Sequence, residues 1–268
     1  MRFGFISCAI GGAPLSVTFD RNHDAMSFFD RFRKDSSERP PEAADSALRQ
    51  KLVELVFGIL RDKNGRIRVE DAISAAATIV GERCIDAVGD YSLRDHELTP
   101  GSRAFSTRAN ELICGDVSDG GVNQIPKDSI VGVLRSRLDA RVYTDADFPA
   151  LSEVFKEYAA RIGNPADWGK VPLSVSEDHL PFIPPLRVGC ETRSHVDDIL
   201  LPVREDRARC LRIATESLAE ILTMVASAID HRLALTLAIE TVNGMSKTAP
   251  MTVKAMQQAQ QSSARKAE

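Results

Sequence analysis

The sequence is poor in the residues that build disulfides and metal sites. Its five cysteines, at positions 8, 84, 114, 190 and 210, are scattered along the chain, and no two of them form a C-x-x-C pair. An odd number of dispersed cysteines argues against a disulfide framework and against a zinc finger. A reducing compartment fits this pattern best, so we expect a cytoplasmic protein.

Motifs for cofactor binding and catalysis are also missing. The chain contains none of the motifs G-x-G-x-x-G, G-x-x-x-x-G-K-[ST], G-x-S-x-G and H-E-x-x-H, and its five histidines are scattered. Cys114 is a candidate nucleophile, but it falls at the end of an expected helix, whereas an activated thiol prefers a helix N-terminus. We expect no cofactor, no metal ion and no catalytic residue, and the balance leans against an enzyme.

The chain has neither an excess of positive charge nor a long apolar run. Its 34 Lys and Arg residues face 38 Asp and Glu residues, which gives a formal charge of −4. This balance argues against nucleic-acid binding, which needs a basic face. Arg135, Arg137 and Arg141 form the best basic cluster, and we expect them to be a solvated helix face. No run approaches the roughly 20 apolar residues that span a bilayer, so we expect no membrane association.

Residues 1–44 are expected to form an N-terminal appendage and linker. Apolar residues alternate on both sides of Gly11-Gly12, which predicts a small β-hairpin. A short export signal is the minor alternative for this stretch. The polar residues 33–46, with two consecutive prolines, predict an exposed linker. A helical core domain is expected over residues 45–245, and a flexible polar tail over residues 246–268.

What the chain does contain is a series of amphipathic helical patterns. In residues 69–88, apolar side chains recur at spacings of three and four, carboxylates occupy the first turn, and Gly89 follows as a left-handed cap. We expect this helix to be mostly buried at the centre of the fold. Asp45 or Ser46 is expected to cap a preceding helix that ends near Leu60. Shorter helices are expected over residues 106–115, 130–138 and 145–162.

Two further stretches complete the predicted fold. Residues 205–242 carry the longest helical pattern, and an unbroken helix of about 38 residues would be about 57 Å long. Such a helix either bends near residues 230–232 or projects and pairs with another chain. Residues 164–190 hold five prolines and predict an extended segment over the core. The predicted fold is mainly α: an irregular single-domain helical bundle with a long C-terminal helix, a proline-rich extended segment and a small N-terminal β-hairpin.

The turn before the central helix resembles part of a calcium-binding EF-hand. With Gly65 as the central loop glycine, Asp62 and Asn64 fall on ligand positions three and five. Asp71 falls on position twelve, where the family has the longer Glu, and Leu60 falls on position one, where it has Asp. The resemblance covers about 40 residues and implies a calcium site. The alternative is a helix–helix turn in which Asn-Gly supplies a positive backbone angle.

Four side chains are the speculative ligand-binding candidates, because they lie in loops 90–128 and 164–190, which a rigid scaffold could hold around a pocket. They are Asn110, Asp116, Trp168 and His179. Each also has a simpler role: turn or cap hydrogen bonds for Asn and Asp, core packing for Trp, and surface exposure for His.

Three functions remain open from the sequence. We expect a soluble, non-catalytic interaction or scaffold protein, homodimeric through the 205–242 helix or bound to another protein. The alternative is a small-molecule-binding protein or enzyme with a pocket under the proline-rich segment. The third hypothesis is an EF-hand-like calcium binder.

Overall fold

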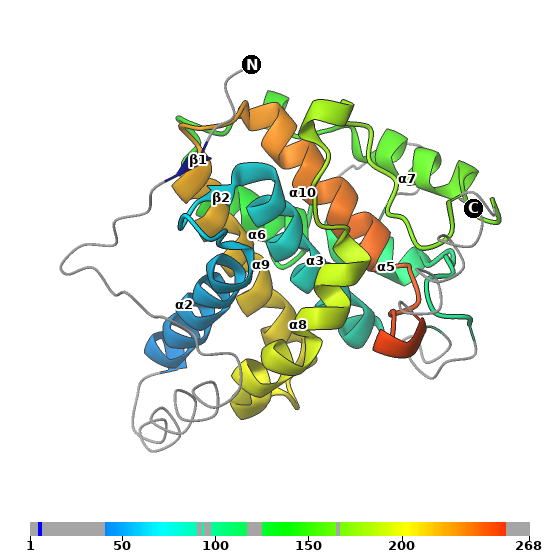
Figure 1. Cartoon of the computed structure of the whole chain (residues 1–268), viewed down its shortest axis with the longest axis horizontal. Coiled ribbons are helices and arrows are strands. Elements are labelled where there is room, and N and C mark those ends of the chain that lie inside the picture. The colour runs from blue at the N-terminus through cyan, green and yellow to red at the C-terminus, as the bar shows by residue number, and fades with distance from the viewer. Residues whose placement is uncertain are drawn as a thin grey trace.

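The computed structural model of the chain is a bundle of helices of varied length (Figure 1). Helices dominate the part of the chain that it describes, which confirms the mainly α fold predicted from the sequence. None of the helices in this part is both long and apolar enough to cross a membrane. The described residues are 5–6, 41–89, 93, 98–116, 125–164 and 167–255.

Helix α3 (Val69–Val88) crosses the middle of the bundle, and both of its predicted ends are confirmed. Seventeen of its 20 residues are buried. The burial is this extensive because α8 (Pro185–Leu200), α9 (Arg207–Val225) and α10 (His231–Met245) all pack against it. The helix ends at Gly89, whose φ of 65° is a left-handed conformation that glycine adopts without strain.

Helix α10 lies close against α3 at Gly81. A Cβ atom on this glycine would lie 2.4 Å from the Cβ of Met245 and 3.0 Å from the carbonyl oxygen of Val242. The absence of a side chain therefore allows the two helix backbones to meet. A side chain of any size at position 81 would push α3 and α10 apart.

Helix α2 (Pro41–Leu60) begins earlier than predicted. A proline fits the first turn of a helix because its missing N–H would have no partner within the helix. Asp45 and Ser46 lie inside α2 rather than at its start, so their prediction as caps was wrong. The exposed linker also cannot extend to residue 46, because helix already covers 41–46.

A short strand pair lies at the entrance to α3. Strand β1 (Phe5–Ile6) pairs antiparallel with β2 (Ile67–Arg68), and Phe5 is opposite Arg68. This contact joins parts of the chain that are far apart in sequence. The second arm of the predicted N-terminal hairpin lies outside the described residues.

The C-terminal helical pattern forms two helices, α9 and α10, rather than the single long helix that was predicted. The break lies close to residues 230–232, where a bend was one of the two predicted possibilities. Asp230 caps the start of α10 by accepting a hydrogen bond from the Leu233 N–H at 2.9 Å. Both helices bury their apolar residues against α3 in the same chain. The predicted dimer relied on an uncovered apolar face of one long helix, and that reason no longer applies. Dimerisation stays a prediction.

Three shorter helices pack around α3, α9 and α10. Helix α5 (Thr107–Cys114) begins at Ser106, which accepts a hydrogen bond from Ala109 N–H, as one of the predicted caps. Helix α6 (Ile130–Arg137) is capped by Ser129. Helix α7 (Leu151–Ala160) starts later than expected, because Asp145–Asp147 forms a separate 3₁₀ turn, η2.

The proline-rich segment has no α-helix from residue 167 to residue 184, but its extended stretches are interrupted by a 3₁₀ helix, η4 (Glu177–His179). Helix α8 starts at Pro185, so the prediction of an extended chain to residue 190 was wrong at this end; proline again occupies the first helical turn. The segment is held down by buried charged side chains. Arg68 donates to the carbonyl oxygens of Asp178 and Leu180, and Asp71 accepts from the Ile183 N–H at 3.1 Å.

Residues 246–251 continue from α10 into the core, which corrects the prediction of a flexible polar tail from residue 246. Lys247 and both of its neighbours in sequence are 1% exposed. Backbone hydrogen bonds join the segment to residues 101–104, for example from Ala104 N–H to the Lys247 carbonyl oxygen at 2.9 Å. The rest of the predicted tail, residues 256–268, lies outside the described part.

Candidate functional site

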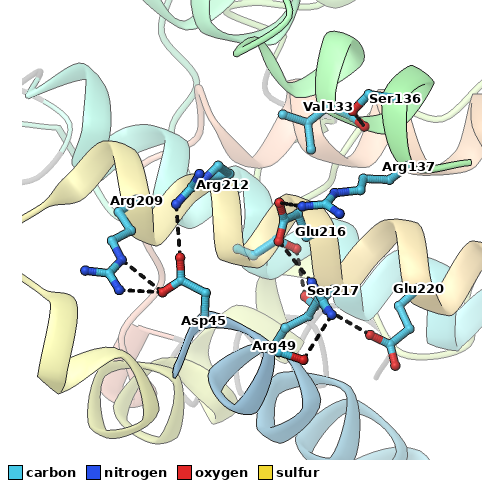
Figure 2. Close-up of polar contacts among 12 residues, drawn as sticks. Asp45, Arg49, Val133, Ser136, Arg137, Arg209, Arg212, Glu216, Ser217 and Glu220 are labelled. Atoms are coloured by element: carbon cyan, nitrogen blue, oxygen red, sulfur yellow. Dashed lines mark hydrogen bonds and ion pairs between the residues drawn. The ribbon is translucent and has the colours of Figure 1, made fainter. Parts of the chain in front are cut away.

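A cleft of about 850 Å³ lies between α2, α6 and α9, and we call it the arginine cleft. Figure 2 shows that its charged side chains converge from these three helices. None of them belongs to the loops 90–128 and 164–190, where the sequence placed a pocket. The lining residues are Glu42, Ala43, Asp45, Ser46, Arg49, Arg137, Arg209, Arg212 and Glu216.

Asp45 of α2 binds two arginines of α9 (Figure 2). One carboxylate oxygen accepts from Arg209 Nη2 at 2.6 Å and from Arg209 Nε at 2.9 Å, and the other accepts from Arg212 Nη2 at 3.0 Å. The side chain of Asp45 is only 12% exposed, so these partners replace much of its hydration. The hydrogen bond to Asp45 also raises the pKa of Arg209.

Glu216 of α9 forms a second cluster of the same kind. Its carboxylate accepts from Arg49 Nη1 at 3.1 Å and from Arg137 Nη2 at 2.5 Å, and its side chain is 7% exposed. Arg49 also donates through Nε to Glu220 at 3.1 Å and through Nη2 to Ser46. One buried carboxylate thus binds two guanidinium groups in each half of the cleft.

The two helices that form the walls carry opposite charge patterns. Asp45 and Arg49 are one turn apart on α2, and they face Arg209–Arg212 and Glu216 on α9, respectively. This crosswise pairing fixes how α2 lies along α9. The apolar spacing on which the helix prediction rests lies on the other side of α9 and does not reveal this pairing. A signal was present in the charged residues, which recur at spacings of three and four from position 209 to 220.

Arg137 and Arg212 are the least engaged arginines of the cleft. A guanidinium carries five N–H donors. Within the described part of the chain, each of these two side chains makes one hydrogen bond, through Nη2. Their side chains are 49% and 53% exposed. Both therefore retain donors on Nε and Nη1 for a bound group. The prediction of a solvated face fits Arg137 only in part, because its guanidinium also binds Glu216.

Asn110, a predicted ligand-binding residue, binds a buried lysine. Its side-chain oxygen and that of Asn243 both accept hydrogen bonds from Lys247 Nζ. The ammonium also lies 4.6 Å from the centre of the Phe155 ring and 5.2 Å from that of Tyr158. Burial lowers the pKa of Lys247 to about 8, because the core disfavours its charged form.

Two cysteines lie within electrostatic reach of this lysine. Burial raises the pKa of Cys84 to about 12 and that of Cys114 to about 11, and the charge of Lys247 opposes both shifts. A buried thiol with a raised pKa is a poor nucleophile. The environment of Cys114 therefore matches the interpretation of this residue as a small core side chain.

The other predicted ligand-binding residues lie apart from the arginine cleft. His179 Nδ1 lies 2.9 Å from Glu70 Oε1. Trp168 is 40% exposed and packs beside Gly101. Asp116 is exposed after the end of α5. Asn110, Trp168 and His179 contact different partners in the described structure: Lys247, Gly101 and Glu70, respectively.

The two acidic side chains of the EF-hand-like pattern, Asp62 and Asp71, accept hydrogen bonds from backbone N–H groups. Asp62 Oδ1 accepts from the backbone N–H groups of Asn64 and Arg66, each at 2.8 Å, which closes an Asx turn. Gly65 has a φ of 75°. Asp71, on position twelve of the resemblance, accepts from Ile183 instead of facing this turn. Among the described residues, no group of three or more His, Cys, Asp or Glu side chains is arranged to hold a metal ion.

Comparisons with known proteins add no family: no protein-family model, no curated protein and no solved structure matches this chain. The arginine cleft must therefore be interpreted from its own geometry and charge.

Proposed function

We propose that this protein is a non-catalytic interaction protein that holds an acidic segment of a partner protein in the arginine cleft. The observation that supports this proposal is the convergence of four guanidinium groups on one concave surface, where Arg137 and Arg212 retain unused donors. Arginine clusters of this kind bind carboxylate and phosphate groups because the planar guanidinium forms paired hydrogen bonds.

A purely structural role is the competing explanation for the cleft. Reciprocal ion pairs between α2 and α9 fix the position of α2, and they need no ligand. Asp45, Arg49 and Glu216 serve that role, since they lie between the two helices. Arg137 and Arg212 are not required for that structural role, because without them each buried carboxylate would still bind one arginine. Substitution of these two residues therefore tests binding without removing the contacts that hold the fold.

Alternative sites have less support. Under the proline-rich segment, where a small-molecule pocket was the alternative, Arg68, Asp71 and Glu240 bind the backbone of the segment. Glu240 accepts from the Ser174 N–H at 2.7 Å and from the Ser174 hydroxyl at 2.5 Å. These contacts hold the segment against the core, whereas the arginine cleft is open to an incoming chain.

The proposal is tested by NMR titration of the full chain with hexaglutamate, observing the arginine Nε–Hε resonances. We expect saturable shifts for Arg137 and Arg212, and an affinity that falls by about tenfold or more in the double variant R137Q/R212Q, because each lost charge-assisted contact contributes roughly 1.5–3 kcal/mol. Binding should weaken as salt is raised.

The matched control is Arg135→Gln. This arginine lies on α6 two residues before Arg137 but outside the cleft, where it pairs with Asp145 at 3.3 Å. Hexaglutamate should bind this variant as it binds the original chain. Equal binding to the original chain and to R137Q/R212Q, or no saturable shift at millimolar peptide, would refute the proposed function.

A further inference from the structure

Residues 171–184 of the proline-rich segment, which we call the strap, lie on the surface of the bundle. None of them is buried, and they contain no α-helix. A few apolar side chains of the strap pack in part against the core: Val171, Leu173, Val175 and Ile183. A segment with so few buried apolar contacts can open while the rest of the fold stays intact. Its attachment therefore depends on polar contacts.

Two carboxylates hold the strap near its two ends. Glu240 of α10 accepts from the Ser174 N–H at 2.7 Å and from the Ser174 hydroxyl at 2.5 Å. Asp71 of α3 accepts from the Ile183 N–H at 3.1 Å. Glu240 is 6% exposed and Asp71 is 7% exposed, so both have lost most of their hydration under the strap. Between them, Arg68 donates to two carbonyl oxygens of the strap.

These two carboxylates differ from the other buried carboxylates of the described chain. Each of the others forms an ion pair with at least one arginine: Asp45, Glu82 and Glu216. Asp71 and Glu240 form no ion pair among the described residues, and their hydrogen-bond partners are N–H and hydroxyl groups of the strap. A buried, ionised carboxylate without a cationic partner costs free energy, and opening of the strap would return its hydration.

We infer that residues 171–184 form a pH-sensitive strap, which is held most firmly when Asp71 and Glu240 are protonated and loosens as they ionise. A protonated carboxyl group keeps an acceptor oxygen for the N–H groups of the strap, so the hydrogen bonds survive protonation. The neutral form also avoids the cost of a buried charge. Opening of the strap uncovers the sides of α3 and α10 that carry these two residues.

The pKa values of the two carboxylates agree with this direction. Burial raises the pKa of Asp71 above its usual 3.8 and that of Glu240 above its usual 4.5, although hydrogen bonds from the strap oppose both shifts. In an open strap both groups are hydrated, so the closed state binds more protons than the open state. Closure is therefore favoured fully below the usual pKa values, and it weakens as the pH rises through the raised values.

Other charged groups face the two carboxylates. Arg68 lowers and Glu70 raises the pKa of the carboxylate on α3. For the carboxylate on α10, Arg161 lowers the pKa and Glu157 raises it. The strap itself carries His179, whose Nδ1 lies 2.9 Å from Glu70 Oε1. This histidine is a second titratable contact of the strap, and the experiment has to separate it from the two carboxylates.

Amide hydrogen exchange of the full chain, followed by NMR, tests the inference. The readout is the protection factor of the Ser174 and Ile183 amides, which corrects for the faster intrinsic exchange at higher pH. We expect both protection factors to fall by about threefold or more between about pH 4.5 and 7.5, because ionisation favours the open strap. The reference is the amide of Leu138, which donates to the Leu134 carbonyl oxygen at 2.9 Å, and its protection should change less.

Neutral variants assign the effect to the two carboxylates. Asp71→Asn and Glu240→Gln remove the ionisation but keep an acceptor oxygen for the strap. In the double variant D71N/E240Q, the protection of the two strap amides should no longer depend on pH. The matched control is Glu177→Gln, which removes an exposed carboxylate of the strap itself. This control should keep the pH dependence of the original chain.

Protection of the strap amides that stays level or rises with pH in the original chain would overturn the inference, and this result needs no variant. A pH dependence that survives in D71N/E240Q would also overturn it, because the effect would then belong to another group such as His179. If the double variant does not fold, the single variants decide: Asp71→Asn should flatten the pH profile of Ile183, and Glu240→Gln that of Ser174. Unchanged profiles in both single variants would contradict the inference.

Discussion

Lys247 carries an ammonium group that the fold removes almost completely from water. Its Nζ atom is bound by two asparagine oxygens and lies over two aromatic rings, but no carboxylate is among its partners in the described structure. Hydrogen bonds and ring contacts only partly replace hydration of a full charge. The lowered pKa of about 8 expresses this imbalance, and it makes stability depend on pH.

Lys247 by itself should contribute a rise of about 1 kcal/mol in the unfolding free energy between pH 8 and 9. Its pKa is lower in the folded chain than the usual 10.5, so the unfolded chain binds more protons in this window, and stability increases with pH. Cys84 and Cys114 act in the opposite direction within the same window, because burial raises their pKa values to about 12 and about 11, whereas the unfolded thiols titrate near 9. Tyr158, whose pKa is raised to about 12, adds to this above pH 9. The lysine effect is therefore measured by urea unfolding from pH 7 to 9.5 of the original chain beside a variant that lacks the lysine.

Lys247→Met isolates the contribution of the lysine. The variant keeps a long side chain and all the other titratable groups, so the difference in unfolding free energy between the original chain and the variant should increase from pH 8 to 9. The variant is expected to be less stable at every pH because two amide oxygens lose their donor, so the test uses only the change of the difference with pH. A difference that does not change with pH would show that the lysine stays charged in the folded chain over this range, so that its pKa is not lowered.

At the scale of elements, the contact between α3 and α10 depends on a position with no side chain. Gly81→Ala should destabilise the fold by about 1–3 kcal/mol, because the new Cβ would overlap with Met245 and the backbone of Val242. This cost outweighs the gain in helix propensity of roughly 1 kcal/mol. Thermal and urea unfolding would measure it.

Gly58→Ala is the control for this prediction. Gly58 also lies inside a helix, α2, but nothing lies within 4 Å of the Cβ that it would gain. The substitution should therefore stabilise the fold by about 0.5–1 kcal/mol through helix propensity alone. Stabilisation by both substitutions would contradict the close packing at Gly81.

The elements that the sequence predicted best are those defined by local patterns. The ends of α3 follow from its apolar spacing, its first-turn carboxylates and Gly89, all within one segment. The break before α10 was one of two alternatives because helix length alone excludes a compact single helix. The start of α8 was missed because proline can either end an extended segment or begin a helix. The arginine cleft was missed because its halves, at Asp45 and Glu216, are far apart in sequence.

For the whole molecule, the decisive question is where the folded domain ends. The sequence placed the boundary at residue 245, since the residues beyond it are polar. In the structure, residues 246–251 fill the core: Tyr158 donates its hydroxyl hydrogen to the Lys247 carbonyl oxygen at 2.9 Å, and Arg193 donates to the Met251 carbonyl oxygen at 3.1 Å. Polarity alone could not reveal this, because the partners lie in distant helices.

Truncation tests this boundary directly. A chain that ends at Ala255 keeps the buried segment and should retain cooperative unfolding. A chain that ends at Met245 loses buried Ala249 and Met251 and leaves Asn110 without its lysine partner, so we expect it to lose several kcal/mol of stability. Circular dichroism during urea unfolding compares the two chains. If both unfold at the same urea concentration, the segment is dispensable, and the domain ends where the sequence first placed it.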